Sequence, residues 1–424
     1  MQPHRLFRDK LKGRISRSLL SSPYIYSLAK EIFIRKRSYN YEANKILTAM
    51  SLEQAAQAYR QQEKVVWTTA FFPSEMIYLF DLVPFAPEVA AGAAASFELG
   101  PELLNEAESI GLSSDSCSFH RCAAAGAKLD YFPLPQYLTA SSHLCDGASR
   151  LFQFMAEKYN RPLYLLDIPA RNNDRSVRYV ASQLEQIASN LERQSRQRLT
   201  PERIRKIFTS ANESRQYQLT TNQIRQSGSL AISGEEGLGY AYLLFLGSGH
   251  PQTVRVWKTL AEELNDHSKE NINQDSPAER NQIRLIWLHL RPYHSSELIS
   301  YLEKELNAAI VMEEVNLVYW PPLDPEKPFE SLARKILANP GLGPLDRRLA
   351  SITEMVGDYN AQGVIHFSHW GCRQSVGGTL LLKKHLKKKQ IPFLNLDGDC
   401  VDGSSFPWGQ AQTRVDSFFE MIKP

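Results

Sequence analysis

The sequence contains only five cysteines in 424 residues. That number is odd and too small for a disulfide-stapled secreted scaffold, so we expect reduced thiols in a cytoplasmic protein. No segment reaches about 18 consecutive apolar residues, which argues against a membrane span. The N-terminus also lacks the apolar core of a secretory signal. Each cysteine is therefore either a small buried side chain of the core or a group that takes part in chemistry.

The chain also has little excess charge of either sign. Its 49 Lys and Arg residues face 46 Asp and Glu residues, giving a formal net charge of +3. This balance does not indicate nucleic acid or another polyanion as a partner. Residues 1–45 are an exception, with 11 basic against 3 acidic residues. We interpret them as part of a solvated helical extension, with contact to nucleic acid or an anionic membrane surface as the alternative.

Several common catalytic signatures are missing. The sequence has no GxxxxGK[ST], HExxH, GxSxG or CxxC motif. Its ten histidines show no metal-ligand spacing, so a zinc site has little support. The GSGH at 247–250 does not match GxGxxG, and we interpret it as a glycine turn before a helix that starts near Gln252.

Short apolar strands alternate with helices of about 10–15 residues, which is typical of βαβ units and parallel sheets. We expect strands at 64–72, 162–169, 284–290, 308–315, 363–370 and 391–397. We expect helices at 47–61, 73–82, 294–306, 328–338, 344–361, 375–389 and 412–422. Thr200 and Pro201 mark a helix start within a polar helical stretch, and residues 264–280 have the composition of a loop.

The predicted fold is α/β, with two Rossmann-like parallel-sheet lobes plus a helical N-terminal and middle region. We divide the chain into a helical extension (1–60), a first α/β domain (61–180), a mainly helical connection (181–280) and a second α/β domain (281–424). Open parallel sheets bind ligands beyond the carboxyl ends of their strands, where the strand order reverses. Functional residues are therefore expected in strand-to-helix turns.

Three cysteines lie where a turn leads into a helix: Cys117, Cys145 and Cys372, of which Cys372 also follows a predicted strand. Unsatisfied N–H groups and the helix dipole favour the thiolate there, and thiolates bind soft metals and iron–sulfur clusters. The three could meet in a cleft between the lobes. The alternative is that they are inert buried thiols. Cys122 is rotated by about 140° from Cys117 if both lie on one helix, so we interpret it as a small buried hydrophobe, and we give Cys400 a structural or supporting role.

These cysteine contexts resemble the 2-hydroxyacyl-CoA dehydratase and benzoyl-CoA reductase subunit family. The resemblance covers about residues 60–424 and is carried by VVWTTAFFPSEMIYLFDLVPF, by the stretch from SCSFHRC to LYLLDIP, and by GVIHFSHWGCRQSVGG and the residues after it. The paired HLCDG and WGC contexts are fairly specific to this family. The basic N-terminal extension departs from the family's usual extent.

The resemblance implies an iron–sulfur subunit with a [4Fe–4S] cluster held by Cys117, Cys145 and Cys372, one iron not being ligated by cysteine. It implies an anaerobic lyase that dehydrates a 2-hydroxyacyl-CoA to a 2-enoyl-CoA through a ketyl radical. A separate ATP-dependent iron–sulfur activator would deliver the low-potential electron. The other implied partner is a homologous subunit in a heterodimer, or a second copy in a homodimer.

Residues near the cysteines and strand ends are candidates for supporting roles. We predict proton transfer by Glu75, contacts from His143 and His120 to sulfur or substrate, and an anion contact at Ser375, Gly377 and Gly378. Gly371, which precedes Cys372, would permit a close backbone approach to the cluster, and Trp370 would pack. Each has a plain structural alternative. The lysines of KKHLKKK (383–389) suit a helix C-terminus, and contact with CoA phosphates is a further possibility.

Three alternatives to the dehydratase stay open at this point. The first is an ATP-dependent reductase of the same family, similar to benzoyl-CoA reductase. The second is a double-cubane protein, which ranks lower because two such clusters need six cysteines and five are present. The third is a non-catalytic companion subunit that relays electrons or has lost its cluster.

Overall fold

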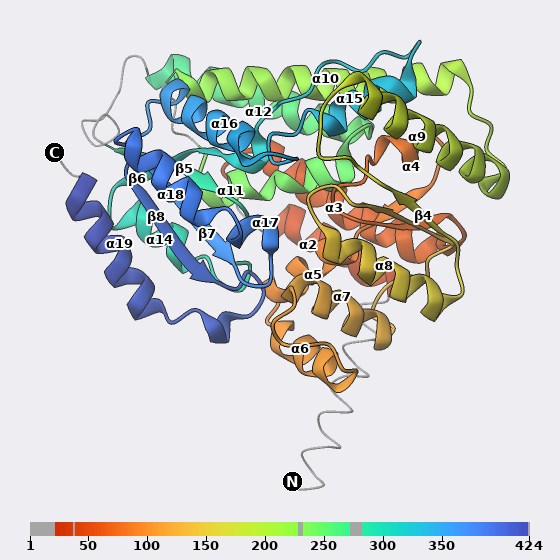
Figure 1. The fold of residues 1–424 in the computed structure, drawn as a ribbon, viewed down its shortest axis with the longest axis horizontal. Coiled ribbons are helices and arrows are strands. Elements are labelled where there is room, and N and C mark those ends of the chain that lie inside the picture. The colour runs from red at the N-terminus through yellow and green to blue at the C-terminus, as the bar shows by residue number, and fades with distance from the viewer. Residues whose placement is uncertain (1–21, 37–38, 228–231, 272–281, 423–424) are drawn as a thin grey trace, which may run out of the picture.

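Two four-stranded parallel sheets organise the computed structural model, which describes residues 22–36, 39–227, 232–271 and 282–422 (Figure 1). The first sheet contains β1 (Val65–Thr68), β2 (Val83–Phe85), β3 (Tyr137–Ser141) and β4 (Leu163–Leu166), in the order β2-β1-β3-β4. The second contains β5 (Ile283–Leu288), β6 (Ala308–Glu313), β7 (Gly363–His369) and β8 (Phe393–Gly398), in the order β6-β5-β7-β8. The predicted α/β class with two parallel sheets is confirmed.

The two sheets share one topology. In each, the second strand lies on one side of the first strand and the third lies on the other. The strand order therefore reverses between β1 and β3 and between β5 and β7. Such reversals are where open α/β sheets bind ligands, so β3 and β7 are the strands whose following turns matter most.

Helices cover both faces of each sheet. Around the first sheet are α4 (Glu75–Tyr78), α5 (Pro87–Ser96), α6 (Gly100–Ser109), α7 (Ser118–Lys128), α8 (Asp146–Tyr159) and α9 (Asp174–Ser195). Around the second are α14 (Glu297–Lys304), α16 (Leu345–Asp358), α17 (Arg373–Val376), α18 (Thr379–Lys388) and α19 (Trp408–Ile422). Helix α15 (Pro328–Leu337) comes from the second half of the chain but packs on α9, in the core cluster of the first sheet. The 310 turns η1 (Gln62–Lys64), η3 (Glu314–Asn316) and η4 (Gly403–Ser405) link elements.

Alternating burial explains this layering. Trp67 of β1 packs with Phe152 of α8, whereas its neighbour Val66 faces the helix α9 side of the same sheet. Successive strand residues point to opposite faces, so a strand buried on both sides is apolar throughout. A further cluster joins Phe119 and Cys122 of α7 to Trp287 of β5. The two lobes thus share one continuous core.

The remaining helices are α2 (Pro23–Lys36), α3 (Glu42–Arg60), α10 (Pro201–Gln226), α11 (Gly234–Gly239), the π-helix η2 (Leu243–Gly247) and α12 (Pro251–Asn271). Figure 1 shows α10 and α12 along one edge of the molecule. Thr200 accepts the Arg203 N–H and Pro201 takes the first helical position, as predicted. The first 21 residues of the predicted N-terminal extension lie outside the described residues.

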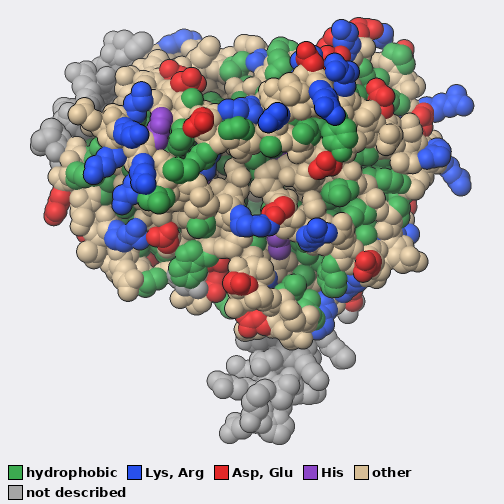
Figure 2. Space-filling model, viewed as in Figure 1, with side chains coloured by type: hydrophobic (Ala, Val, Ile, Leu, Met, Phe, Trp, Pro, Cys, Tyr) green, Lys and Arg blue, Asp and Glu red, His purple; other side chains and the backbone are tan. Residues whose placement is uncertain are grey.

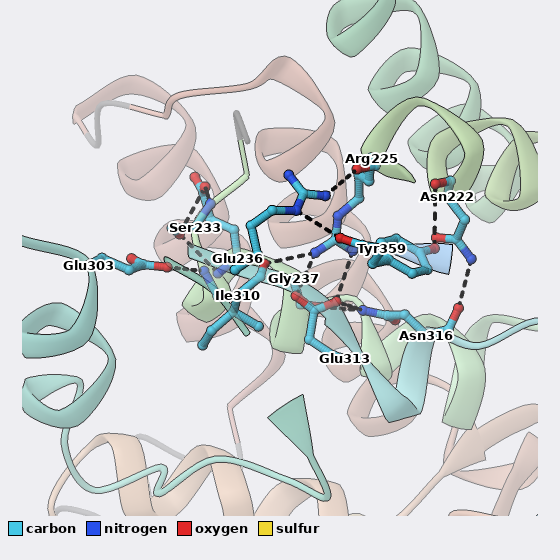
Figure 3. A network of polar contacts seen from close by, with 12 residues as sticks. Asn222, Arg225, Ser233, Glu236, Gly237, Glu303, Ile310, Glu313, Asn316 and Tyr359 are labelled. Atoms are coloured by element: carbon cyan, nitrogen blue, oxygen red, sulfur yellow. Dashed lines mark hydrogen bonds and ion pairs between the residues drawn. The ribbon is translucent and has the colours of Figure 1, made fainter. Parts of the chain in front are cut away.

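A buried ion pair fastens α10 to the second sheet (Figure 3). Both terminal nitrogens of Arg225 donate to the Glu313 carboxylate, at 2.8 and 2.9 Å, and one also donates to the Ile310 carbonyl. Asn316 Nδ2 donates to the same carboxylate at 2.8 Å. Glu313 is fully buried and Arg225 is 5% exposed. The pair is therefore bidentate and well satisfied, which is what a buried charge requires.

Two local expectations are wrong. Residues 264–271 are helical rather than loop, because α12 continues with Leu260 and Leu264 buried on one side and polar side chains facing solvent. The single helix expected over 375–389 is instead α17 and α18, with Gly377 and Gly378 between them. The glycine turn at 247–250 is present, with Gly249 at a φ of +90°.

Candidate functional site

Each of the three turn cysteines is the N-cap residue of a helix. Cys117 precedes α7, Cys145 precedes α8 and Cys372 precedes α17. Cys145 follows β3 by four residues and Cys372 follows β7 by three. The corresponding strand of each sheet thus leads into a cysteine at the point where strand order reverses. The predicted turn-to-helix setting is confirmed for all three.

Two contacts join the cysteine turns across the lobes. Gly371 has a φ of +72°, and a Cβ on it would lie 2.7 Å from the backbone nitrogen of Cys117. Only glycine combines that backbone conformation with such a close approach. The second contact is an ion pair between Arg373 and Asp146, the residues that directly follow Cys372 and Cys145. Gly371 thus closely approaches the Cys117 backbone, whereas its predicted approach to a cluster stays a prediction.

Cys145 also follows an unusual backbone. Leu144 has a φ of +60°, in the left-handed region that a branched side chain rarely adopts. Its side chain reaches Gly341, in the segment between α15 and α16 of the second lobe. Strained residues persist where surrounding structure fixes them, and they cluster at functional sites.

Burial outweighs the helix ends in setting the thiol pKa values. It raises the pKa of Cys145 to about 11 and raises those of Cys117 and Cys372. The N–H groups two and three residues beyond each cysteine lower its pKa, as expected, but by less. The thiolate is therefore not favoured in the metal-free chain. Metal binding at these residues would have to release their protons.

The charges of the three cysteines affect one another's pKa values. The negative charges of Cys372 and Cys145 both raise the pKa of Cys117, and Cys372 raises that of Cys145. All three are partly exposed, whereas Cys122 and Cys400 are buried. Burial raises the pKa of Cys122 to about 12 and that of Cys400 well above its ordinary value, and the charges of Cys117 and Cys372 also raise the pKa of Cys400. Exposure therefore separates the same three and two cysteines as the sequence does.

A histidine ring nitrogen lies beside each sulfur. Nε2 of His369 is 3.5 Å from Cys117 Sγ, Nε2 of His120 is 3.7 Å from Cys145 Sγ, and Nε2 of His289 is 3.8 Å from Cys372 Sγ. Burial lowers the pKa of His369 and His120 to about 4. Sequence reasoning named His120 but missed His369 and His289. The sequence does hold one feature that could have identified these two histidines: each lies at or just beyond the end of a buried strand.

The donor set does not suit a single ion. Among the described residues, no three His, Cys, Asp or Glu side chains are placed to hold one metal ion. A mononuclear thiolate site draws its sulfurs to about 2.3 Å from one metal. An iron–sulfur cluster instead distributes its cysteines over separate irons. Three partly exposed sulfurs with helix N–H groups directed at them fit a cluster better.

Glu75 is placed in an ion pair away from these sulfurs. It begins α4, is fully buried, and its Oε1 accepts hydrogen bonds from Lys335 Nζ at 2.5 Å and Ser248 Oγ at 2.6 Å. Its Oε2 has no hydrogen-bond partner among the described residues. Burial would raise the pKa of Glu75, but Lys335 and Ser248 together hold it below its ordinary value. The pair joins α4 to α15, and both helices bury side chains in the core cluster of the first sheet.

The Lys335→Met variant is expected to lose stability in a pH-dependent way. With Lys335 present, the low pKa of Glu75 stabilises the fold above about pH 4, and this contribution is lost as pH falls through that pKa. Without Lys335, a carboxylate is buried unpaired, costing about 3 kcal/mol near neutral pH. Burial then raises its pKa, so the penalty should shrink toward pH 5.

Urea midpoints at pH 5.0 and 7.5 measure this effect, with Lys384→Met on the exposed face of α18 as the control. A penalty that is equal at both pH values would contradict an ionised Glu75.

The other two predicted catalytic residues differ in their contacts. Ser375 is buried, with its Oγ accepting the His369 N–H at 3.2 Å and contacting His366 Nε2 at 3.2 Å. His143 is 4% exposed, and its Nε2 has no hydrogen-bond partner among the described residues. Its ring packs edge-on against Phe71 at 5.6 Å, and burial lowers its pKa to about 4. Ser375 therefore supports the Cys372 turn, while His143 keeps a free polar atom.

Two further surfaces bear on ligand binding. Figure 2 shows Lys and Arg side chains gathered over α16 and α18, where the lysines of the KKHLKKK run lie. A cavity of about 370 Å³ lies between α2, α3 and the start of α12, and none of the three cysteines lines it.

Trp370, which was expected to pack, is 47% exposed beside Cys372. Within the described residues, no helix is both long and apolar enough to cross a membrane.

Comparison with known proteins identifies the family of this chain. The model of the family "2-hydroxyglutaryl-CoA dehydratase, D-component" matches residues 69–422. The (R)-2-hydroxyisocaproyl-CoA dehydratase alpha subunit of Clostridioides difficile is 23% identical over 399 residues, covering 90% of this chain and 96% of that protein. The (R)-phenyllactyl-CoA dehydratase alpha subunit of Clostridium sporogenes is 22% identical, covering 87% and 92%. A benzoyl-CoA reductase subunit of Thauera aromatica is 23% identical, covering 85% and 89%. The resemblance seen in the cysteine contexts is confirmed: the chain belongs to the 2-hydroxyglutaryl-CoA dehydratase D-component family.

Proposed function

We propose that this chain is the iron–sulfur subunit of a 2-hydroxyacyl-CoA dehydratase and holds a [4Fe–4S] cluster through Cys117, Cys145 and Cys372. The observation that carries the proposal is the shared placement of these cysteines. Each caps a helix, and Gly371 and the Arg373–Asp146 ion pair bring their turns together. The two lobes contribute two ligands and one ligand, respectively, to a site between them.

Bound there, the cluster supplies a low-potential electron and one iron position that no cysteine occupies. The chain's own contribution is a set of oriented N–H groups at three helix N-termini, which stabilise the sulfurs as thiolates once their protons are released. Substrate would lie beside the Arg373–Asp146 pair, because both residues are exposed next to the cysteines. The reaction proposed is loss of water from a 2-hydroxyacyl-CoA to give a 2-enoyl-CoA.

Among the predicted catalytic residues, His143 keeps a role toward substrate. Its buried Nε2 lacks a partner among the described residues, so a substrate hydroxyl or carbonyl group would satisfy it. The contacts of Glu75 and Ser375 support positioning roles instead, because protein groups engage Oε1 of Glu75 and the hydroxyl of Ser375. A buried Glu75 that is paired with Lys335 holds α15 against α4.

The names of the relatives support an assembly of more than one subunit. Each is named as one subunit, so we propose a second subunit as partner. A partner homologous to this chain and an ATP-dependent activator as electron donor are proposed from the family resemblance alone. The similarity to a benzoyl-CoA reductase subunit makes an acyl-CoA reductase the second candidate function. Both functions use the same cysteine site, so substrate is what separates them.

Turnover under anaerobic conditions tests the proposal. The chain, reconstituted with iron and sulfide and supplied with its partner subunit, activator and ATP, is offered (R)-2-hydroxyisocaproyl-CoA, (R)-phenyllactyl-CoA or benzoyl-CoA. We expect a 2-enoyl-CoA from one of the hydroxyacyl thioesters, detected by mass spectrometry, and none when ATP is omitted. A reduced ring product from benzoyl-CoA alone would favour the reductase. A loaded cluster with no product from any thioester would contradict both.

A further inference from the structure

His369 is held rigidly against the sulfur of Cys117. It ends β7, its side chain is 1% exposed, and its Nε2 lies 3.5 Å from Cys117 Sγ. Phe119 packs edge-on against its ring at 5.2 Å, and His289 stacks on it at 6.2 Å. The ring therefore has one orientation, set by aromatic neighbours from both lobes.

The proton on this ring is placed by a backbone contact. His369 Nδ1 accepts the N–H of Cys400 at 3.1 Å, and a ring nitrogen that accepts carries no proton. Its proton is then on Nε2, the nitrogen that faces sulfur. Asp399 Oδ1 is 3.9 Å from Nδ1, too far for a hydrogen bond.

The same Asp399 oxygen fixes the loop that supplies this contact. It accepts hydrogen bonds from Ser118 Oγ and the Val401 N–H, both at 2.7 Å. Ser118 directly follows Cys117, so the aspartate links the cysteine's helix to the loop carrying the Cys400 N–H. The tautomer of His369 is thereby coupled to the position of Cys117.

We propose that His369 donates an Nε2–H···S hydrogen bond to Cys117 and thereby raises the reduction potential of the cluster that Cys117 holds. This inference rests on the proposed function. A donor at a ligand sulfur stabilises the reduced cluster, which carries the extra negative charge, relative to the oxidised one. His120 and His289 lie beside the other two sulfurs at 3.7 and 3.8 Å. No described contact gives them an equally defined proton, so His369 is the positioning residue assigned here.

The test is an EPR-monitored redox titration of the reconstituted chain and its His369 variants. His369→Leu removes the donor, and we expect its one-electron equilibrium to shift tenfold toward the oxidised cluster, a potential about 59 mV lower. His369→Gln can place an amide N–H near the former Nε2 and should stay close to the wild type. His385→Leu, which removes a half-buried imidazole on α18 that contacts Thr353, is the control and should not shift the potential.

Each result decides the matter. A lower potential in His369→Leu, with the glutamine variant and the control unchanged, supports the hydrogen bond. Equal potentials in all four proteins overturn it and leave the proposed function standing. A wild-type chain that holds no cluster overturns both. Should His369→Leu fail to assemble a cluster, His369→Asn replaces it, because its shorter amide does not reach the Nε2 position.

Discussion

Replacing Cys145 by alanine is expected to abolish cluster assembly. The reconstituted wild type should hold about four irons per chain, and the Cys145→Ala chain should hold a small fraction of that. The physical reason is that the Cys145→Ala chain keeps only two of the three proposed ligands, Cys117 and Cys372, and so leaves a second iron without a cysteine. Iron and sulfide analysis after anaerobic desalting measures the loss.

Cys122→Ala is the matched control for this loss. Cys122 lies on α7, five residues from Cys117, and its side chain is buried in the shared core. The substitution removes a cysteine without touching the site, so the iron content should stay at the wild-type value. A Cys145→Ala chain with wild-type iron would refute the ligand assignment. Iron loss in a folded Cys122→Ala chain would refute the separation of the five cysteines.

The Glu313→Gln variant is expected to lose about 3 kcal/mol of unfolding free energy, because it leaves the Arg225 charge buried and unpaired. Arg225 has its guanidinium against this carboxylate and the Ile310 carbonyl, with little access to water. A urea-denaturation midpoint, monitored by fluorescence, measures the change. Glu330→Gln breaks the exposed Arg334–Glu330 pair on α15 and should cost no more than about 0.5 kcal/mol.

A double variant separates the charge from the packing. Arg225→Met combined with Glu313→Gln removes both charges and should recover part of the stability lost by Glu313→Gln alone. The recovered part is the cost of the unpaired arginine. If the free-energy losses of Arg225→Met and Glu313→Gln simply add in the double variant, this account is contradicted. It would assign the loss to packing against Gly237, whose position leaves no room for a side chain beside Glu313.

Sequence alone predicted the α/β class and the setting of the cysteines, because both depend on local patterns. Buried parallel strands are apolar runs, and a helix start is visible after HLC in HLCDG and after the strand that leads into WGC. Strands β2 and β3, which are three and five residues long, were not predicted. Such short strands are defined by their neighbours, so propensity cannot locate them. The division of the chain into four domains stays a prediction.

The site itself was predicted only in part, because the residues that surround the three cysteines come from distant parts of the chain. His369 and His289 come from the second sheet and lie beside cysteine sulfurs only in the folded chain. No spacing along the sequence therefore predicts these contacts. Glu75 was expected to transfer protons, yet its partner Lys335 lies 260 residues away. The prediction of thiolates considered the N–H groups at the helix N-termini, which lower a thiol pKa. It underestimated burial, which raises all three thiol pKa values.

Iron, sulfide and EPR analysis of the anaerobically reconstituted wild-type chain tests the central claim most directly. The account predicts about four irons and four sulfides per chain and, after reduction by one electron, the EPR signal of a [4Fe–4S] cluster. Iron well below about four per chain after reconstitution of a folded protein would contradict it.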